Sequence, residues 1–473
     1  MRWVVLVLMW LSSTFAWAQE SALHADFRRE GERFHDACGM FSFKKAFGCA
    51  AQLFTDHPLH IAVGSIAPQN GIGFGPAFVT HYTPNETWRL TWNVDAVGST
   101  NGSWRAGGYM KIIHTPVVQI NVVTSPVTTK PGEKKAKIRL AVHPYTVFNL
   151  YAQAISLNKL YYFGLGPDSV EANRSVFGMR ETIVGGSVIK PVTEWPAISK
   201  LNLALLGEVN GRFVNLRGNH GESSPSIEQI YTEGTAPGLA AQPGFVQLGE
   251  GVRIKPVLFN DHLQLNYLAN FQQFFAPSNS HYSFLRWTVD LGHTFNLYGQ
   301  TQSESRDTNG PNECAPSLGA EKCQPISFSR NLAGMIGIRL LISESMTSGS
   351  SVVPFFFQPT LGGSDINGRQ ALGSYQDYRF RAPNILLLRE NFEHSIWGPL
   401  GFAFMADQGK VALARGDIGF SHLKHSFATG ITIRAGGLPA VSLMYAWGGT
   451  EGQHTMFNLN TSLLGGSSRS SLY

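Results

Sequence analysis

The chain alternates apolar and polar residues over long segments, as β-strands with one apolar face do. Between Trp88 and Ala96 every second residue is apolar, and the residues between them are polar or charged. Because successive side chains of a strand point to opposite faces, all charges of this segment lie on one face. The same alternation recurs at 103–110, 263–272 and 285–291. The pattern therefore predicts many strands that separate an apolar environment from a polar one.

This alternation marks seventeen candidate strands. They lie near 71–81, 87–98, 103–114, 138–153, 159–165, 174–190, 200–215, 247–259, 263–275, 282–297, 327–344, 351–359, 384–395, 400–406, 423–434, 440–447 and 454–464. A single-chain bacterial barrel has an even number of strands, so we expect about sixteen, with 159–165 the weakest candidate.

Two fold classes share this pattern: a transmembrane antiparallel β-barrel, and an antiparallel sandwich with one solvated face. The candidate segments are about ten residues long, whereas strands of soluble proteins average about five or six. Trp and Tyr lie near the segment ends, as in the aromatic girdles of membrane barrels. These two features favour an all-β transmembrane barrel.

Composition supports the barrel. Charged residues make up 15% of the chain, against about 25% in ordinary domains, and aromatic residues make up 12%. After the N-terminal segment no apolar run reaches the length of about eighteen residues that a spanning helix needs. An exported chain of this kind is typical of the bacterial outer membrane. The net charge of +5 is small for 473 residues and gives no reason to expect a nucleic-acid partner.

The N-terminus has the features of a secretory signal peptide, residues 1–18. Arg2 gives the positive region, residues 3–11 are apolar, and a small-residue cleavage site ends at Ala18. A membrane anchor is the alternative, but the apolar run is too short to span a bilayer. We therefore expect cleavage after Ala18.

Residues 19–60 form a separate segment before a barrel at 61–473. Within this segment, 41–54 carry apolar side chains at roughly helical spacing, which predicts a short amphipathic helix. The helix lies either in the periplasm or in the lumen as a partial plug, and the sequence favours neither.

The four cysteines form two local pairs, Cys38 with Cys49 and Cys314 with Cys323. In an exported chain an even number of cysteines predicts disulfides, and neither pair has the spacing of zinc ligands. We expect the first disulfide in the periplasm and the second in an extracellular loop. The fifteen histidines are scattered, so no metal or other cofactor is expected.

Long polar connections occupy 115–137, 216–246, 298–326 and 360–383. Because periplasmic turns of barrels are short, all four are expected to be extracellular. The basic run 130–137 reads as a solvated loop tip, with contact to lipopolysaccharide phosphates as the alternative.

The C-terminal part of the chain carries four motifs in order. The apolar PFFFQPTLGG is followed by LGSYQDYRFR at 372–381, and then by ILLLRENFEHSIWGPLGFAFMADQG, which contains Asp407 and Gly409. The last motif is ATGITIRAGGLPAVSLMYAWGGTEG. Together they resemble the barrel domain of the BamA/TamA-type outer-membrane assembly family, also called the bacterial surface antigen family. The resemblance is clearest over 354–464 and extends to the whole barrel.

The resemblance implies a loop that folds back into the lumen, where an arginine at its tip meets an acidic residue of the inner wall. Matching LGSY to the family's pattern puts Gly373 at the position of the arginine and Asp407 at that of the acid. We then expect Arg369, Arg379 or Arg381 to replace the missing arginine, or the contact to be absent. The resemblance assigns the lumen-loop motif to Gly362, Gly363, Arg369, Leu372, Gly373, Ser374, Tyr375, Arg379 and Arg381, and the barrel-wall partner to Asp407 and Gly409.

The resemblance also implies a role in inserting or translocating proteins or lipids at the outer membrane. The implied partners are outer-membrane lipid, lipopolysaccharide, and periplasmic or outer-membrane proteins. Family members with that role carry periplasmic polypeptide-transport-associated domains, whereas here only residues 19–60 precede the predicted barrel. The alternative is a passive pore or structural barrel, because a lumen lined by Arg89, Asn93, Asp95 and Arg105 would hold water. A loop lodged in the lumen would block such a pore.

An enzyme is not expected. The sequence has no G-x-S-x-G and no H-E-x-x-H motif. Asp290 and His293 are three residues apart, so they face opposite sides of a strand. Asp261 and His262 read as solvated turn residues.

Overall fold

The computed structural model describes residues 58–85, 87–115, 145–192, 201–219, 221–259, 262–306, 326–397, 400–435 and 438–459, together with Arg28 and Glu32. The signal peptide, the helix expected at 41–54 and all four cysteines lie outside these residues.

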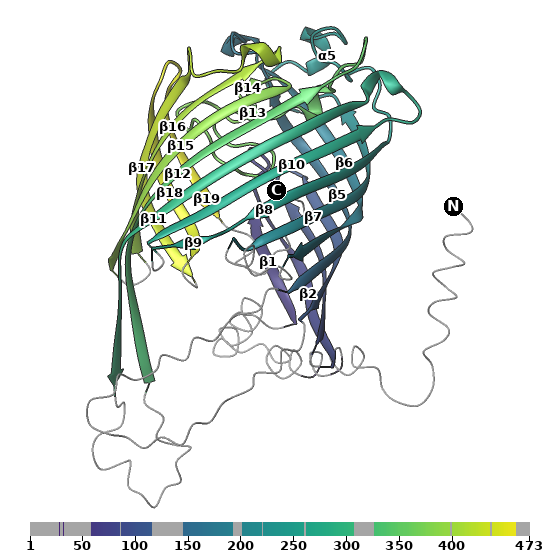
Figure 1. The fold of residues 1–473 in the computed structure, drawn as a ribbon. Coiled ribbons are helices and arrows are strands. Elements are labelled where there is room, and N and C mark those ends of the chain that lie inside the picture. Colours follow the sequence, from purple (N-terminus) through teal and green to yellow (C-terminus); the bar gives the residue numbers. More distant parts are fainter. Residues whose placement is uncertain are drawn as a thin grey trace, which may run out of the picture.

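The described chain forms one large antiparallel sheet in which each strand pairs with its neighbours in sequence (Figure 1). Its strands are β1 (Leu59–Ser65), β2 (Ile72–Asn85), β3 (Trp88–Ser99), β4 (Trp104–His114), β5 (Thr146–Tyr162), β6 (Ser175–Pro191), β7 (Leu203–Arg217), β8 (Phe245–Ile254), β9 (Val257–Leu258), β10 (Leu263–Phe275), β11 (Phe284–Arg306), β12 (Ile326–Met346), β15 (Asn384–Trp397), β16 (Leu400–Ala412), β17 (Lys424–Ala435), β18 (Leu438–Gly449) and β19 (Gly452–Leu459). A second, two-stranded sheet joins β13 (Thr360–Leu361) to β14 (Phe380–Arg381). Among the described residues from 58 to 459, the helical elements are one-turn segments: η1 (Glu171–Asn173), α5 (Ile227–Ile230), η2 (Ser280–Tyr282), η4 (Phe355–Phe357) and η5 (Arg415–Asp417).

The expected number of sixteen strands is confirmed. The large sheet has seventeen labelled strands, but β8 and β9 pair in succession with the same strand, β10, and together form one interrupted strand. Three of the individual assignments are wrong, and together they reduce the seventeen candidates to sixteen strands. The segments predicted at 138–153 and 159–165 are one strand, β5; the segment at 351–359 forms the turn η4 instead of a strand; and β1 was not predicted.

Two of these errors have a structural reason. A bulge between Leu157 and Leu160 interrupts the alternation of β5 without ending the strand. In η4 the side chains of Phe355 and Phe357 are buried and Phe356 packs against the same core, so three consecutive aromatic residues contact one apolar environment. A strand would send them to opposite faces.

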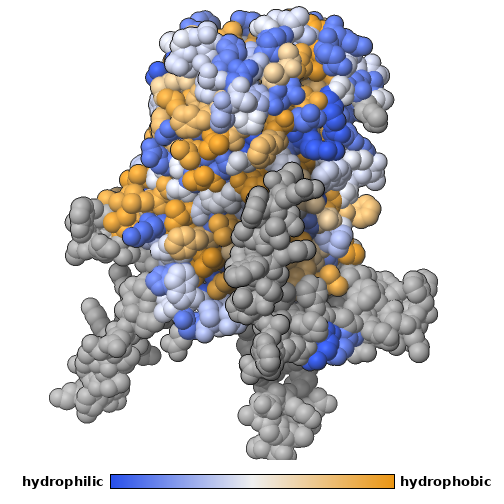
Figure 2. Space-filling view, turned by 90° about the vertical axis from the view of Figure 1, so that its right-hand side faces the viewer, coloured by the Kyte–Doolittle hydropathy of each residue, from blue (hydrophilic) through white to orange (hydrophobic). Residues whose placement is uncertain are grey.

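The alternation gives the barrel an apolar outer wall and a polar inner wall. On β3, Trp92 and Val94 are 44% and 58% exposed on the outer face, while Asp95 is buried. Inside, Arg105 of β4 binds Asp95 at 3.0 Å. Figure 2 shows hydrophobic residues gathered over the middle of the visible wall and hydrophilic residues toward its upper end. This is the surface of a transmembrane β-barrel. None of the helices in the described part of the chain is long and apolar enough to cross a membrane.

The first and last strands, β1 and β19, flank a seam in the wall. They approach each other, but within the described residues β1 is paired with β2 and β19 with β18, and no ladder joins β1 to β19. The segment expected to begin the barrel, 71–81, is the second strand, so the barrel starts at residue 59 rather than 61.

The two ends of the barrel differ. We call the end at which β1 begins and β19 finishes the terminal end, and the opposite end the loop end. Since the strands alternate in direction, β4 is connected to β5 and β11 to β12 at the terminal end, whereas β7 is connected to β8 and β12 to β15 at the loop end (Figure 1). The expectation that all four long connections lie at one extracellular end is therefore wrong. The connection that contains Cys314 and Cys323 joins β11 to β12 at the terminal end.

The apolar core lies inside the barrel at the loop end. Phe355 is fully buried there, with its ring centroid 5.0 Å from Tyr162 and 5.2 Å from Phe177. Phe357 and Tyr378 belong to the same cluster. The connection between β12 and β15 thus supplies the centre of this core, and the strands supply its surroundings.

Candidate functional site

The segment 360–383, which we call the lumen loop, is largely buried inside the barrel. β13 and β14 pair and bring its two ends together. Between them, Leu372, Tyr375 and Phe380 pack with Ile385 of β15 and Val411 of β16, among other buried residues. Apolar contacts therefore hold the loop against the inner wall.

Gly362 and Gly363 permit the close return of the loop. Their φ angles are +102° and +60°, in the region that favours glycine. A Cβ on Gly362 would lie 2.5 Å from Cβ of Arg379, and one on Gly363 would lie 2.6 Å from the backbone nitrogen of Asp377. Both glycines are required where the outgoing and returning halves of the loop touch.

The barrel-wall acid, Asp407 of β16, binds the loop through the backbone. The Leu372 N–H donates to Oδ2 at 2.8 Å. The same carboxylate accepts from Arg389 of β15, with Nε 2.7 Å from Oδ1 and Nη2 2.9 Å from Oδ2. Nη2 of Arg389 also donates to the carbonyl of Gln370. A wall ion pair thus presents both an acceptor and a donor to the loop backbone.

Of the two expected alternatives, replacement of the family's arginine by another loop arginine or absence of that contact, the structure shows the second. In the part of the chain that the structure describes, Arg369, Arg379 and Arg381 do not bind Asp407. Its carboxylate is already taken by Arg389, which lies directly opposite it in the β15–β16 hairpin. We did not predict Arg389. Two opposite charges on the strands of one hairpin were a signal for this pair, although a bulge between Ser395 and Trp397 shifts the register by one residue from a count that starts at the turn.

Gly373, at the position of the family's arginine, faces β18 and β19. A Cβ here would meet the Sδ and Cε atoms of Met456 at 2.5 Å and Cβ of Ala446 at 3.2 Å. The next residue, Ser374, donates its N–H to Oγ of Ser426 at 2.8 Å. Packing and backbone hydrogen bonds therefore position the tip, and an arginine side chain has no space there unless Met456 moves.

Arg379 crosses to the last hairpin of the barrel. Its Nε lies 2.9 and 2.7 Å from the two carboxylate oxygens of Glu451, in the turn between β18 and β19. Nη1 and Nη2 donate to Oγ and the carbonyl of Ser169 at 2.8 and 2.6 Å. The guanidinium also lies 4.6 Å from the ring centroid of Phe380, a cation–π distance.

Arg381 binds inside the core instead. Its Nη1 donates to the carbonyls of Phe355 and Gln358 at 2.7 and 3.3 Å. Burial lowers the pKa of Arg381 to about 10, so the guanidinium stays charged at neutral pH. This arginine ties the return of the lumen loop to the turn η4.

Below the lumen loop lies a cavity of about 210 Å³ whose polar wall is ion-paired. Arg339 donates to Asp290 through Nε and Nη2, both at 2.8 Å. Arg212 binds Glu181, with Nε 2.9 Å from Oε1. At the loop end the cavity stops against Phe357 and the lumen loop.

The acid–histidine pair considered in the sequence is not assembled. Asp290 binds Arg339, and His293 contacts the Tyr267 hydroxyl at 2.7 Å. Among the described residues no group of three His, Cys, Asp or Glu side chains is placed to hold a metal ion.

Comparisons with known proteins find solved structures only at very low sequence identity. No protein-family model matches the sequence, and no curated protein sequence matches it. Among solved structures, CdiB from Acinetobacter baumannii has a TM-score of 0.46 and 10% identity, over 85% of this chain and 59% of that one. BamA from Haemophilus ducreyi lacking POTRA domains 1–3 has a TM-score of 0.45 and 9% identity, over 84% of this chain and 69% of that one. The copper transporter OprC has a TM-score of 0.31 and 9% identity, over 82% and 62%. The chain thus spans less than two thirds of the CdiB and OprC structures, and the assignment of a barrel rests on its own strand pairing.

Replacing Gly363 by alanine should destabilise the barrel by about 2 kcal/mol or more, because the added Cβ meets backbone as well as a positive φ. Gly368→Ala is the matched control: it has φ +76° in the same loop, but no atom lies within 4 Å of its Cβ. Urea unfolding in lipid vesicles, followed by Trp fluorescence, measures both. An equal loss of stability in the two variants would contradict the close approach of Gly363 to Asp377.

Replacing Asp407 by asparagine should cost about 3 kcal/mol, because it leaves Arg389 inside the barrel without its carboxylate. Glu390→Gln removes a charge from the adjacent, exposed position and should change the unfolding free energy by less than about 0.5 kcal/mol. The double variant Arg389→Gln/Asp407→Asn should recover part of the loss. If Asp407→Asn unfolds at the wild-type urea concentration, the wall pair does not hold the loop.

Proposed function

We propose that this chain is a closed outer-membrane barrel of the assembly and translocation type, acting on proteins or lipids. One observation carries the proposal: the loop end of the lumen is filled by a packed apolar core to which the lumen loop contributes. A passive pore needs a continuous wet passage. Here Phe355 and Leu372 are fully buried inside the loop end of the barrel.

The energy of this core supports a barrel that is closed at rest. Each fully buried Phe or Leu side chain contributes about 1.5–3 kcal/mol. Exposing Phe355, Phe357, Leu372 and Phe380 together would therefore cost on the order of 8 kcal/mol. Spontaneous opening would be rare, so opening would need a partner or substrate that offsets this cost.

The resemblance of the motifs at 354–464 to the BamA/TamA-type family supplies the assembly role. In this proposal the terminal end faces the periplasm and its proteins, and the loop end faces lipopolysaccharide. The outer wall contacts membrane lipid. We assign no enzymatic step; Asp290, the acid nearest to His293 in sequence, pairs with Arg339.

Planar-bilayer conductance of the refolded chain tests closure. The intact protein should give a small or flickering current. A variant with residues 354–381 replaced by a Gly/Ser linker of equal length should give a large, steady one. Arg369→Ala, a change at an exposed position of the same loop, is the control and should behave as wild type. A large steady current from the intact chain would favour the passive pore.

A second measurement tests the assembly role itself. Vesicles that contain the intact protein should accept an unfolded small outer-membrane barrel faster than empty vesicles do, as measured by the heat-dependent gel mobility of the folded product. Equal rates, together with a closed channel, would assign the chain a structural role in the membrane.

A further inference from the structure

The wall has a seam where its first and last strands, β1 and β19, approach each other. Every other boundary between neighbouring strands carries an antiparallel ladder, whereas the described residues of β1 and β19 have none between them. Contacts from inside the barrel reach both sides of this seam. The lumen loop lies beside both of them at the loop end.

On one side of the seam, the loop binds the β18–β19 hairpin. Arg379 pairs with Glu451 at 2.7 Å, and the two side chains are only 2% and 14% exposed. The Thr450 N–H lies 3.4 Å from the Tyr375 hydroxyl. A Cβ on Gly449 would lie 2.5 Å from Oγ of Ser374, so the loop tip and the hairpin are in direct contact.

On the other side, the same loop binds the turn between β1 and β2. Gln69 donates through Nε2 to Oδ2 of Asp377 at 2.6 Å. The Tyr378 hydroxyl donates to the carbonyl of Pro68 at 3.0 Å. Asp377 is itself held by the Ser364 N–H at 2.7 Å, which fixes its carboxylate within the loop.

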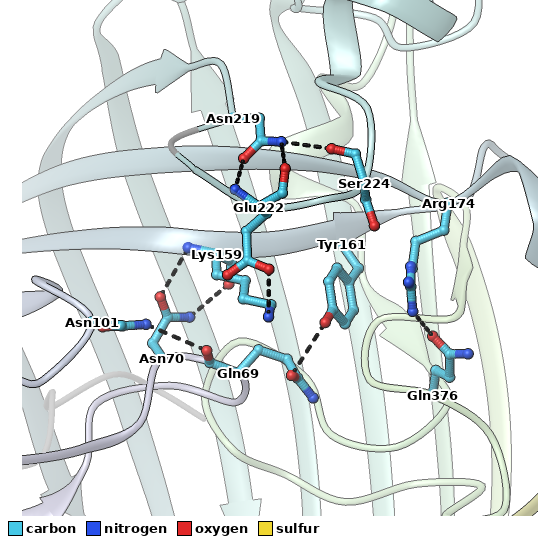
Figure 3. Close-up of polar contacts among 10 residues, drawn as sticks. All are labelled: Gln69, Asn70, Asn101, Lys159, Tyr161, Arg174, Asn219, Glu222, Ser224 and Gln376. Carbon is cyan, nitrogen blue, oxygen red and sulfur yellow. Dashed lines mark hydrogen bonds and ion pairs between the residues drawn. The ribbon is translucent and has the colours of Figure 1, made fainter.

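The β1–β2 turn is anchored to the rest of the barrel, as Figure 3 shows. Asn70 donates to the carbonyl of Lys159 on β5 at 2.7 Å, and Asn101, from the β3–β4 turn, donates to the carbonyl of Gln69 at 3.4 Å. The Tyr161 hydroxyl lies 3.4 Å from Oε1 of Gln69. This side of the seam is therefore fixed to β5 and to the β3–β4 turn.

We propose that residues 373–379 form a seam staple, which holds the β18–β19 hairpin against the anchored β1–β2 turn. Arg379 and Glu451 form its detachable contact. Asp377 and Tyr378 bind the anchored side, and the intervening backbone spans the boundary that lacks a ladder. The inference goes beyond the proposed function, since it concerns how the wall is closed, whatever the barrel transports.

Hydrogen–deuterium exchange with mass spectrometry on the refolded protein in lipid nanodiscs tests the staple. Glu451→Gln keeps the size of the side chain and removes its charge. Exchange of peptides covering β19 and the β18–β19 turn should become about tenfold faster, while peptides covering β5 to β8 keep their wild-type rates. The charge swap Arg379→Glu/Glu451→Arg should restore part of the protection.

Glu344→Gln is the matched control, because it breaks another loop-end ion pair, Arg415 with Glu344 at 2.9 Å, between η5 and β12 and away from the seam. It should leave β19 unchanged. If the charge swap fails to refold, Asp377→Asn weakens the staple from the anchored side and should accelerate the same peptides. Unchanged β19 exchange in Glu451→Gln, or an equal increase in every strand, would overturn the staple. Neither result depends on the conductance of the barrel.

Discussion

A barrel of sixteen strands is too wide for the side chains of its own wall to fill, and this constraint shapes the rest of the structure. Barrels of this size leave an aqueous channel unless another part of the chain enters the lumen. Here the connection between β12 and β15 enters it. Phe355 brings an aromatic turn into the centre, and Leu372 and Phe380 bring the lumen loop against the wall. These apolar side chains pack against one another inside the lumen, and this packing closes the loop end.

Filling the lumen with apolar groups raises the cost of any unpaired charge inside it. The wall meets this requirement with cross-strand ion pairs, and the loop pairs Arg379 with Glu451 in the same way. Where the loop meets Asp407, it offers a backbone N–H, because Arg389 already neutralises the acid. The pairs are Asp95 with Arg105, Glu181 with Arg212, Asp290 with Arg339, and Asp407 with Arg389.

The lumen loop closes the barrel in two places, the lumen and the seam. Its apolar residues close the lumen, and its tip bridges the two sides of the seam through Asp377 and Arg379. A partner that withdraws the loop would therefore release the last hairpin as well. A partner that displaces Glu451 from Arg379 would loosen the seam and leave the aromatic core around Phe355 in place. The two effects are separable because the ion pair lies at the edge of the loop and the core lies at its base.

The sequence by itself determined the fold class and the environment of each strand face, because the alternation at Trp92, Val94 and Asp95 is a local property that any strand pairing preserves. It also determined that a polar, glycine-punctuated segment follows an aromatic run near the C-terminus. Only the tertiary structure decided which groups meet. Arg389 binds Asp407 because the register of two strands places them opposite each other. Arg379 reaches Glu451 because barrel closure brings the last hairpin to the loop. Arg379 and Glu451 are 72 positions apart, and a bulge shifts the register between Arg389 and Asp407, so no local pattern encodes either contact.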